Sequence, residues 1–189
     1  GCFSTHPLKN LNACGDSGFI TTNDEKIFSG VKRLRNHGMT DRNTVNEFGY
    51  VSRMDNLQAA ILNYRLQKLD KIIEKRRKNA QTYFDKIQTR KIYMPKEEEY
   101  EFNTYHTFVI QTERRDELKK YLMNQRIETA IHYPTPIHLQ PAARDLGYKL
   151  GKFPVTESQR EKILTLPVNQ SLSRDEVQRI ISSVNDFFS

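Results

Sequence analysis

The feature that most constrains this chain is the spacing of apolar residues over positions 54–87. From Met54 to Ile73 apolar side chains recur mainly at steps of three and four residues, which is the spacing of one face of an amphipathic helix, and the pattern resumes from Tyr83 to Ile87. We therefore predict one long helix over this range, either straight or bent. A helix of this length with a single apolar face is typical of a bridge between domains or of a contact with a partner subunit. The periodic residues are Met54, Leu57, Ala60, Ile61, Tyr64, Leu69, Ile72, Ile73, Tyr83, Phe84 and Ile87.

The residues before position 40 predict one strand and one helix. Phe19–Thr22 follows two glycines and has the composition of a short strand. Thr22 and Glu25 form a capping box, which predicts a helix that begins at Thr22. This helix is expected to run to about His37, with Gly38 as its stop.

A loop precedes the long helix, and a region of alternating strands and helices follows it. Residues 39–50 are polar and aperiodic, which predicts a loop, and Ser52 with Asp55 forms a second capping box ahead of the long helix. After Pro95 strands and helices alternate, which predicts an α/β module with too few strands for a full doubly wound sheet. The elements expected there are strands over 106–110 and 129–132, helices over 115–125, after Pro154 and from Ser173, and a short apolar run over 164–167.

Composition excludes several classes of protein. The 189 residues include 37% hydrophobic residues with ten Phe and nine Tyr, which is enough for a core. No apolar run approaches the roughly 20 residues of a membrane span, and no signal-peptide pattern begins the chain. Cys2 and Cys14 are too few for a disulfide scaffold and form no zinc motif. These properties favour a soluble, cytoplasmic protein with reduced thiols.

Gly1 is not an initiator methionine, and we expect further residues upstream.

The net charge of +7 raises the question of nucleic acid. The densest basic stretch, residues 71–78, lies inside the long helical pattern, where its charges spread around the solvated face. No zinc finger, aromatic RNA-binding motif or glycine-rich arm accompanies it. We therefore expect no nucleic-acid partner, and a positive field suits an anionic small-molecule substrate instead.

Lys9 is the first candidate for chemistry. Pro7 biases His6 toward an extended conformation, so Lys9 lies on a short, stiff segment between small polar residues. A lysine that acts as a nucleophile toward a carbonyl needs such fixed placement. A surface lysine in a loop is the alternative, and the segment alone favours this alternative, because exposed lysines are the norm.

Six blocks of sequence resemble the DegT/StrS family of sugar-nucleotide aminotransferases, in the order in which that family carries them. The segment 3–24 contains Phe-Ser, then His-Pro, Lys-Asn-Leu, a Gly-Asp-Ser-Gly turn and a Thr-Asn-Asp end, and it resembles the family's pyridoxal-phosphate lysine segment. Ser17 departs from the family's usual glycine. The other five blocks are residues 34–38, 52–60, 132–141, 151–157 and 164–167.

The resemblance implies an α/β fold, that of the aspartate aminotransferase-like, fold type I, pyridoxal-phosphate-dependent transferases. Residues 1–53 would be the C-terminal part of the large cofactor-binding domain, residues 54–90 the connecting helix, and residues 91–189 the small α/β domain. The family's carboxylate partner for the pyridine nitrogen, its stacking aromatic and its phosphate turn all precede the lysine. We therefore expect this chain alone to bind the coenzyme weakly or not at all, and to be inactive.

The resemblance also assigns cofactor roles to individual residues. Lys9 matches the lysine that covalently holds pyridoxal phosphate, and Ser4 matches a hydroxyl donor to its phosphate. The family often has an asparagine that reaches the phosphate across the dimer, where this chain has Val51. Because valine cannot make that contact, Ser52 or Arg53 is the candidate substitute.

The block at residues 132–141 carries the candidate substrate contacts. In the family this loop reaches the active site from the small domain, so His138 and Tyr133 are the expected substrate-binding residues. His132 is expected to be structural. The two histidines lack a third ligand at suitable spacing, so we expect no metal.

The function implied by the resemblance is transfer of an amino group, with glutamate as the expected donor, to a keto-sugar carried by a nucleotide. Lysine at position 9 favours transamination, because similar sugar dehydratases carry histidine there. The resemblance further implies a homodimer with shared active sites and a role in amino-sugar or cell-surface polysaccharide biosynthesis. The alternative is a non-catalytic regulatory or dimerisation module of the same fold. The identity of the sugar, the carbon and the nucleotide stays open.

Overall fold

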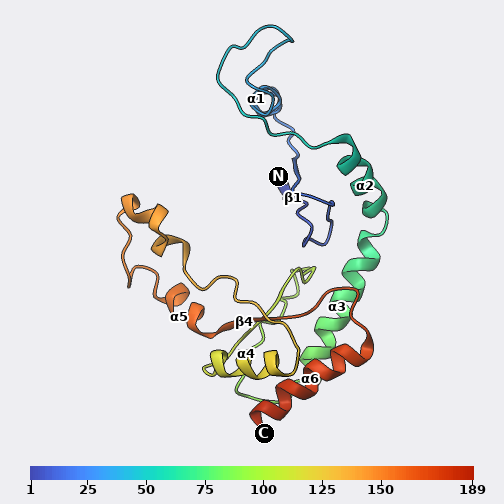
Figure 1. Cartoon of the computed structure of the whole chain (residues 1–189), viewed down its shortest axis with the longest axis vertical. Coiled ribbons are helices and arrows are strands. Elements are labelled where there is room, and N and C mark those ends of the chain that lie inside the picture. The colour runs from blue at the N-terminus through green and yellow to red at the C-terminus, as the bar shows by residue number, and fades with distance from the viewer. The chain divides into compact units, whose positions relative to one another are not determined.

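The computed structural model describes all 189 residues, and they form two compact units (Figure 1). Unit 1 comprises Gly1–Ile72 and unit 2 comprises Ile73–Ser189. The boundary falls inside helix α3, Leu69–Lys86. None of the helices combines the length and apolar character that crossing a bilayer requires. The three-part division that we inferred from the sequence stays a prediction.

Unit 1 begins with a two-stranded antiparallel sheet. Strands β1, Cys2–Ser4, and β2, Gly18–Ile20, place Phe3 opposite Phe19, and the two rings stack with centroids 4.8 Å apart. Gly18 is required at this sheet, because a Cβ there would lie 2.6 Å from the Phe3 carbonyl oxygen. The predicted strand at 19–22 is therefore present, shifted toward the N-terminus.

Helix α1, Glu25–Leu34, begins later and ends earlier than the sequence predicts. Its N-cap is Asp24, whose carboxylate accepts hydrogen bonds from Lys26 N and Ile27 N. The Thr22 hydroxyl accepts instead from Asp24 N, so the capping box that we expected at Thr22 is wrong. Asp24 is the N-cap residue because its charged carboxylate is a strong acceptor for two backbone N–H groups of the first turn.

The second expected capping box, at Ser52, is also wrong. Helix α2, Asn56–Leu66, has Asp55 as its N-cap residue, without a side-chain cap bond. Ser52 is used elsewhere: its N–H donates to Arg35 O at 3.0 Å and its carbonyl accepts from Arg35 Nε at 3.2 Å.

Residues 38–49 form the predicted loop, and two glycines close its neck. Gly38 has φ +76°, and a Cβ there would lie 1.7 Å from the Glu47 carbonyl oxygen. A Cβ on Gly49 would lie 2.3 Å from Gly38 N, so neither position has room for a side chain. Arg33 Nε donates to a carboxylate oxygen of Glu47 at 3.0 Å and fastens the loop to α1.

The long predicted helix is two helices. It breaks after α2, where Gln67 is the C-cap residue and Lys68 N bonds to Arg65 O at 2.9 Å, and α3 then begins at Leu69. No glycine or proline marks the break, so apolar spacing alone could not place it.

Unit 2 is built around a second two-stranded antiparallel sheet. Strand β3, Phe108–Gln111, pairs with β4, Ile163–Leu166. The predicted strand at 129–132 is reduced to one bridge, in which Ala130 exchanges two backbone hydrogen bonds with Thr165. The other elements are α4, Arg115–Asn124; the 3₁₀ segments η1, Ile137–Leu139, and η2, Pro141–Leu146; α5, Pro154–Lys162; and α6, Arg174–Phe188.

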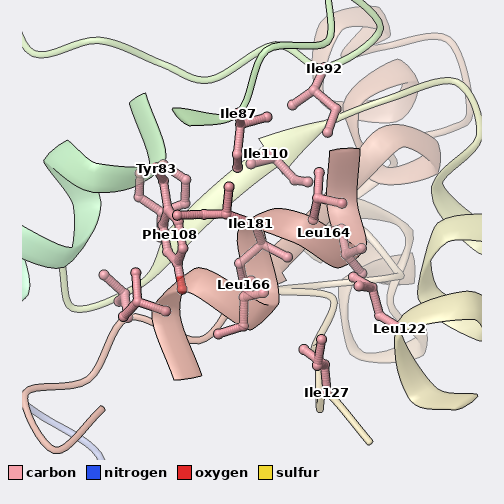
Figure 2. Close-up of a cluster of buried hydrophobic side chains, with 14 of the residues drawn as sticks. Tyr83, Ile87, Ile92, Phe108, Ile110, Leu122, Ile127, Leu164, Leu166 and Ile181 are labelled. Carbon is pink, nitrogen blue, oxygen red and sulfur yellow. The ribbon is translucent and has the colours of Figure 1, made fainter. Parts of the chain in front are cut away.

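The hydrophobic core lies in unit 2, where α3, α4 and α6 contribute side chains that meet those of the sheet (Figure 2). Tyr83 is fully buried, and its hydroxyl donates to the Pro167 carbonyl at 2.6 Å. Burial raises the pKa of this hydroxyl far above its ordinary value of 10, so it stays a donor. Other members are Ile87, Ile92, Phe108, Ile110, Leu118, Leu122, Ile127, Leu164, Leu166, Val177, Ile181 and Val184.

Candidate active site

Lys9 lies in a loop that joins β1 to β2, residues 5–17, which we call the lysine loop. Thr5 and Ser17 close its base: Thr5 N donates to Ser17 O at 2.9 Å, and their hydroxyl oxygens are 2.6 Å apart. Ala13 N donates to Thr5 O at 2.8 Å, and both residues are only 1% exposed. Serine at position 17 therefore contributes a bond that the family's usual glycine could not make.

The turn that carries Lys9 is fixed by its neighbours. Lys9 N donates to the His6 carbonyl at 2.8 Å, and His6 Nδ1 accepts from Leu8 N at 3.2 Å. The Asn12 side-chain amide donates to the Pro7 carbonyl at 2.8 Å. The Cα of Lys9 is thereby placed on a turn with its backbone bonded, which matches the stiff segment that the sequence predicts.

Two side chains of α2 also hold the lysine loop. Gln58 Oε1 accepts from Cys14 N at 2.9 Å. Arg65 Nη1 donates to the carbonyl oxygens of Asn12 at 2.7 Å and Ala13 at 3.2 Å. Sequence reasoning missed both residues, although their spacing of seven places them on one face of α2.

Ser4 and Arg53, the other expected cofactor contacts in unit 1, are both exposed. The Ser4 hydroxyl has one long contact, with His6 N at 3.5 Å. Arg53 makes no hydrogen bond or ion pair within the chain, whereas Arg33 and Arg35 are both engaged. Val51 is 64% exposed and bridges to Asn36. The geometry leaves the Ser4 hydroxyl and the Arg53 guanidinium accessible, and their roles stay predictions.

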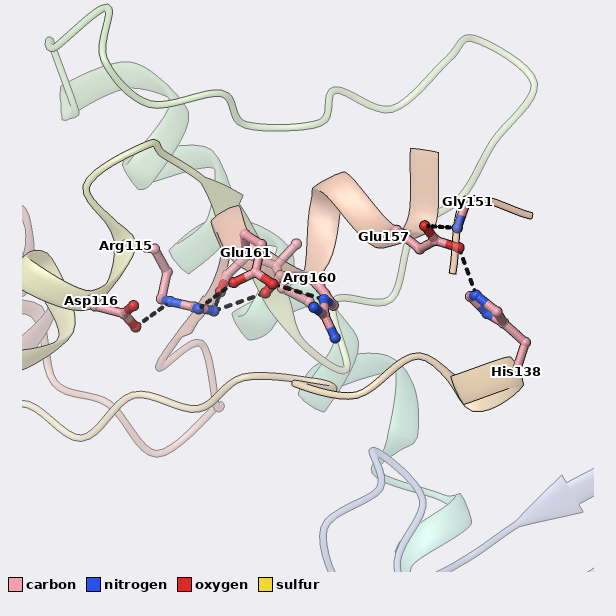
Figure 3. Close-up of polar contacts among 8 residues, drawn as sticks. Arg115, Asp116, His138, Gly151, Glu157, Arg160 and Glu161 are labelled. Carbon is pink, nitrogen blue, oxygen red and sulfur yellow. Dashed lines mark hydrogen bonds and ion pairs between the residues drawn. The ribbon is translucent and has the colours of Figure 1, made fainter. Parts of the chain in front are cut away.

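His138, the expected substrate contact of unit 2, lies at a buried pair (Figure 3). Its Nε2 is 2.9 Å from Glu157 Oε1, and His138 is 7% exposed. Glu157 Oε1 also accepts from Phe153 N at 3.2 Å, and Glu157 Oε2 accepts from Gly151 N at 2.7 Å. Glu157 thus ties η1 to the turn before α5. This arrangement gives His138 a positioning role for residues 137–153, and its expected substrate contact stays a prediction.

The pKa of Glu157 reflects two opposing causes. Burial by itself raises the pKa of this carboxyl. The hydrogen bonds from Gly151 N, His138 and Phe153 N favour the carboxylate, and together they hold the pKa below its usual value of 4.5. Glu157 is therefore a carboxylate at neutral pH.

Tyr133 is 73% exposed, so its ring is available to a ligand. The preceding His132 is anchored instead, with Nδ1 2.9 Å from the Thr165 hydroxyl of β4. This contact fits the structural role that we expected of His132. Lys9, Ser4 and Arg53 belong to unit 1, and His138 and Tyr133 belong to unit 2.

A second polar cluster in Figure 3 is structural. Arg115 is 7% exposed and donates to the carbonyl oxygens of Arg160 at 3.0 Å and Ile163 at 3.3 Å. Its Nε donates to Asp116 at 2.6 Å. These bonds attach the start of α4 to the junction of α5 and β4.

The chain belongs to the DegT/DnrJ/EryC1/StrS aminotransferase family, whose model matches residues 1–185. It is 36% identical to a pleiotropic regulatory protein of Geobacillus stearothermophilus, over 98% of this chain and 51% of that protein. It is 38% identical to the dTDP-3-amino-3,6-dideoxy-alpha-D-galactopyranose transaminase of Aneurinibacillus thermoaerophilus, over 90% of this chain and 46% of the enzyme.

Solved structures agree with this membership. The structure is similar to that of DesV from Streptomyces venezuelae, with a TM-score of 0.93 and 34% identity over 98% of this chain and 50% of DesV. NtdA from Bacillus subtilis, solved with bound cofactor PMP, matches with a TM-score of 0.85 and 29% identity over 97% of this chain and 44% of NtdA. The fold is the C-terminal portion of a fold type I aminotransferase, as the sequence predicts. The chain spans about half the length of the relatives it matches.

Proposed function

We propose that this chain supplies the coenzyme-holding lysine and the small domain of an aminotransferase that acts on a nucleotide-linked keto-sugar. The observation that carries the proposal is the lysine loop, in which a turn bonded on both sides holds Lys9. The name of the Aneurinibacillus relative, a dTDP-amino-sugar transaminase, supports the substrate class. Glutamate as the donor of the amino group is part of the same proposal.

The residues of unit 1 fit part of pyridoxal phosphate. An aldehyde needs a primary amine, which Lys9 carries, and a phosphate needs hydroxyl and cationic donors, which Ser4 and Arg53 carry. Both Ser4 and Arg53 are exposed, so neither has to give up a buried interaction to bind a ligand. A match to a relative solved with bound PMP, the aminated form of this coenzyme, supports the assignment.

Each group of the chain then has a distinct task. Pyridoxal phosphate, when bound, supplies an electron-withdrawing ring. The Lys9 amine, tethered on a fixed turn, accepts and returns a proton beside the reacting carbon, and its tether keeps it within reach. The Ser4 hydroxyl donates to a phosphate oxygen, and the Arg53 guanidinium adds charge there. Tyr133 and His138 are the residues that would contact the substrate.

The assembly that we propose is a homodimer with shared active sites. An exposed, unpaired guanidinium at Arg53, ahead of α2, is suited to a phosphate held by a second copy. Cys2 and Cys14 are free and exposed, a state that fits a reducing compartment, and we place the protein in the cytoplasm.

A second candidate function rests on the name of another relative. The Geobacillus protein, 36% identical, is named a pleiotropic regulatory protein. A regulatory module of the same fold would keep the loop and the small domain without turnover.

Replacing Lys9 by alanine separates the two functions. The test uses this chain preceded by an upstream half taken from DesV of Streptomyces venezuelae, which we call the restored protein. We expect borohydride to fix pyridoxal phosphate to Lys9, and Lys9→Ala to abolish both this attachment and amino transfer to dTDP-keto-sugars. Lys26→Ala, at an exposed lysine of α1, is the matched control and should leave both intact.

Retained turnover in Lys9→Ala would contradict the enzymatic proposal. Attachment without turnover in the parent protein would favour the regulatory one. The chain of 189 residues alone is expected to bind the coenzyme weakly or not at all.

A further inference from the structure

Two residues of α2 have no part in the proposed binding of coenzyme or substrate, yet the side chains of both bond the lysine loop. Gln58 and Arg65 are half-buried and lie 44 and 53 residues along the chain from the atoms that they bond. Leu62, the one buried residue of α2, lies between them on the same face. The two polar side chains on this face of α2 thus both bond the lysine loop.

The bonds from α2 fall on backbone groups rather than on side chains. Gln58 accepts from Cys14 N, and Arg65 donates to two successive carbonyl oxygens, those of Asn12 and Ala13. Gln58 also lies close to Gly15, where an added Cβ would be 3.1 Å from Gln58 Nε2. Backbone bonds of this kind fix the path of the chain whatever side chains the loop carries.

These bonded groups connect directly to the turn of Lys9. Ala13, whose carbonyl accepts from Arg65, donates its own N–H to the Thr5 carbonyl at the base of the loop. Asn12, whose carbonyl accepts from the same guanidinium, donates its side-chain amide to the Pro7 carbonyl. Releasing α2 would therefore loosen residues 12–14 first, and through them the two ends of the turn.

We propose that Gln58 and Arg65 are positioning residues that hold the lysine loop on α2 and thereby fix where the Lys9 amine lies. The effect on the Lys9 amine rests on the function proposed above. The hydrogen bonds from Gln58 and Arg65 to the lysine loop, which we call the clamp, do not depend on that function. Neither residue is assigned contact with substrate or coenzyme.

The first measurement is amide hydrogen exchange in the chain of 189 residues, without coenzyme. In Gln58→Met, which keeps the length of the side chain and removes the acceptor, exchange at Cys14 N–H should accelerate about fivefold, the factor of one lost hydrogen bond. Gln58→Glu keeps an acceptor at the same reach and should restore protection. Asn63→Met, on the exposed side of α2, is the matched control and should change nothing.

The second measurement is the attachment of pyridoxal phosphate to Lys9 in the restored protein, after borohydride reduction and peptide mapping. At subsaturating coenzyme, Gln58→Met and Arg65→Met should each lower the yield at Lys9 by about the same fivefold factor. Gln58→Glu and Arg65→Lys should recover most of it. Thermal unfolding is recorded for each variant, because a loss of global stability would not be rescued by a conservative side chain in this selective way.

The outcomes distinguish the two proposals. Unchanged exchange at Cys14 in Gln58→Met, or unchanged attachment at Lys9 in both methionine variants, would overturn the positioning role and leave the proposed function standing. If the restored parent protein attaches no coenzyme at Lys9, the proposed function fails, and exchange alone then decides whether the clamp exists.

Discussion

Glu157 shows how much a single carboxylate can organise. It accepts hydrogen bonds from Gly151 N and Phe153 N and pairs with His138, so three separated positions converge on two oxygens. Because these bonds favour its charged form, the pKa of Glu157 lies below 4.5 in the folded chain. Its contribution to stability is fully present above that value, and is lost as the pH falls through the folded pKa.

Glu157→Gln tests this dependence. The amide keeps one acceptor oxygen but cannot titrate, so the variant should be less stable than the parent at neutral pH. The difference between their free energies of unfolding should shrink as the pH falls below 4.5. Urea unfolding at several pH values measures it. A difference that stays constant on acidification would show that the charge of Glu157 contributes nothing.

The site illustrates which residues a sequence can point to. Lys9 and Ser4 were identifiable because they lie in one continuous motif, five residues apart. Gln58 and Glu157 were not, because each acts on backbone groups that only folding brings near, across 44 residues in the case of Gln58. Thr5 and Ser17 are intermediate: both lie in the motif, but only strand pairing brings their hydroxyls together.

At the scale of elements, capping residues decide where helices begin. The helix expected from Ser173 is confirmed, and it begins with a capping box: Ser173 Oγ accepts from Glu176 N at 3.2 Å, and the Glu176 carboxylate accepts from Ser173 N at 2.8 Å. The boxes expected at Thr22 and Ser52 are wrong: the Thr22 hydroxyl accepts from Asp24 N, and α2 has Asp55 as its N-cap residue, without a side-chain cap bond. A local motif therefore does not establish a cap by itself, as at Thr22, where a neighbouring backbone N–H bonds the hydroxyl instead.

Ser173→Ala should destabilise the chain by about 1 kcal/mol, the usual cost of removing an N-cap hydroxyl. Removal leaves Glu176 N without its acceptor at the start of α6. Ser171→Ala, in the exposed turn just before, is the control and should have almost no effect. Equal midpoints for the two variants in urea unfolding would count against the cap.

At the scale of the whole molecule, burial is unevenly divided between the units. In unit 1 the buried hydrophobic residues are Ala13 and Leu62, whereas the main cluster lies entirely in unit 2. Phe28 is 52% exposed and Phe48 is fully exposed in unit 1. Since apolar burial is the main source of stability, unit 2 should be the more stable of the two.

The same substitution in each unit measures the difference. Leu122 is fully buried in the cluster, and Leu122→Ala should cost about 2–5 kcal/mol through lost contacts and a cavity. Leu62 is 7% exposed and lies outside the cluster, so Leu62→Ala should cost less. Urea unfolding followed by circular dichroism gives both values. A larger loss at Leu62 would contradict the division of burial described here.

The fold class was predictable because the family motifs extend along the whole chain. The break between α2 and α3 was not, since no glycine or proline marks it and the step of five from Tyr64 to Leu69 does not distinguish a break from a bend. The strand predicted over 129–132 is longer than the single bridge that the structure contains. Its composition suits a strand, but only Ala130 finds backbone partners on β4.

The closed neck of residues 38–49 has a practical consequence for exchanging parts between relatives. Backbone packs against backbone there: a Cβ on Gly38 would meet the Glu47 carbonyl oxygen, and a Cβ on Gly49 would meet Gly38 N. Grafting this segment from another family member is therefore best done with both glycines carried inside the transplanted piece. A splice made between the two glycines would combine backbone from two proteins at a place where neither position has room for a Cβ.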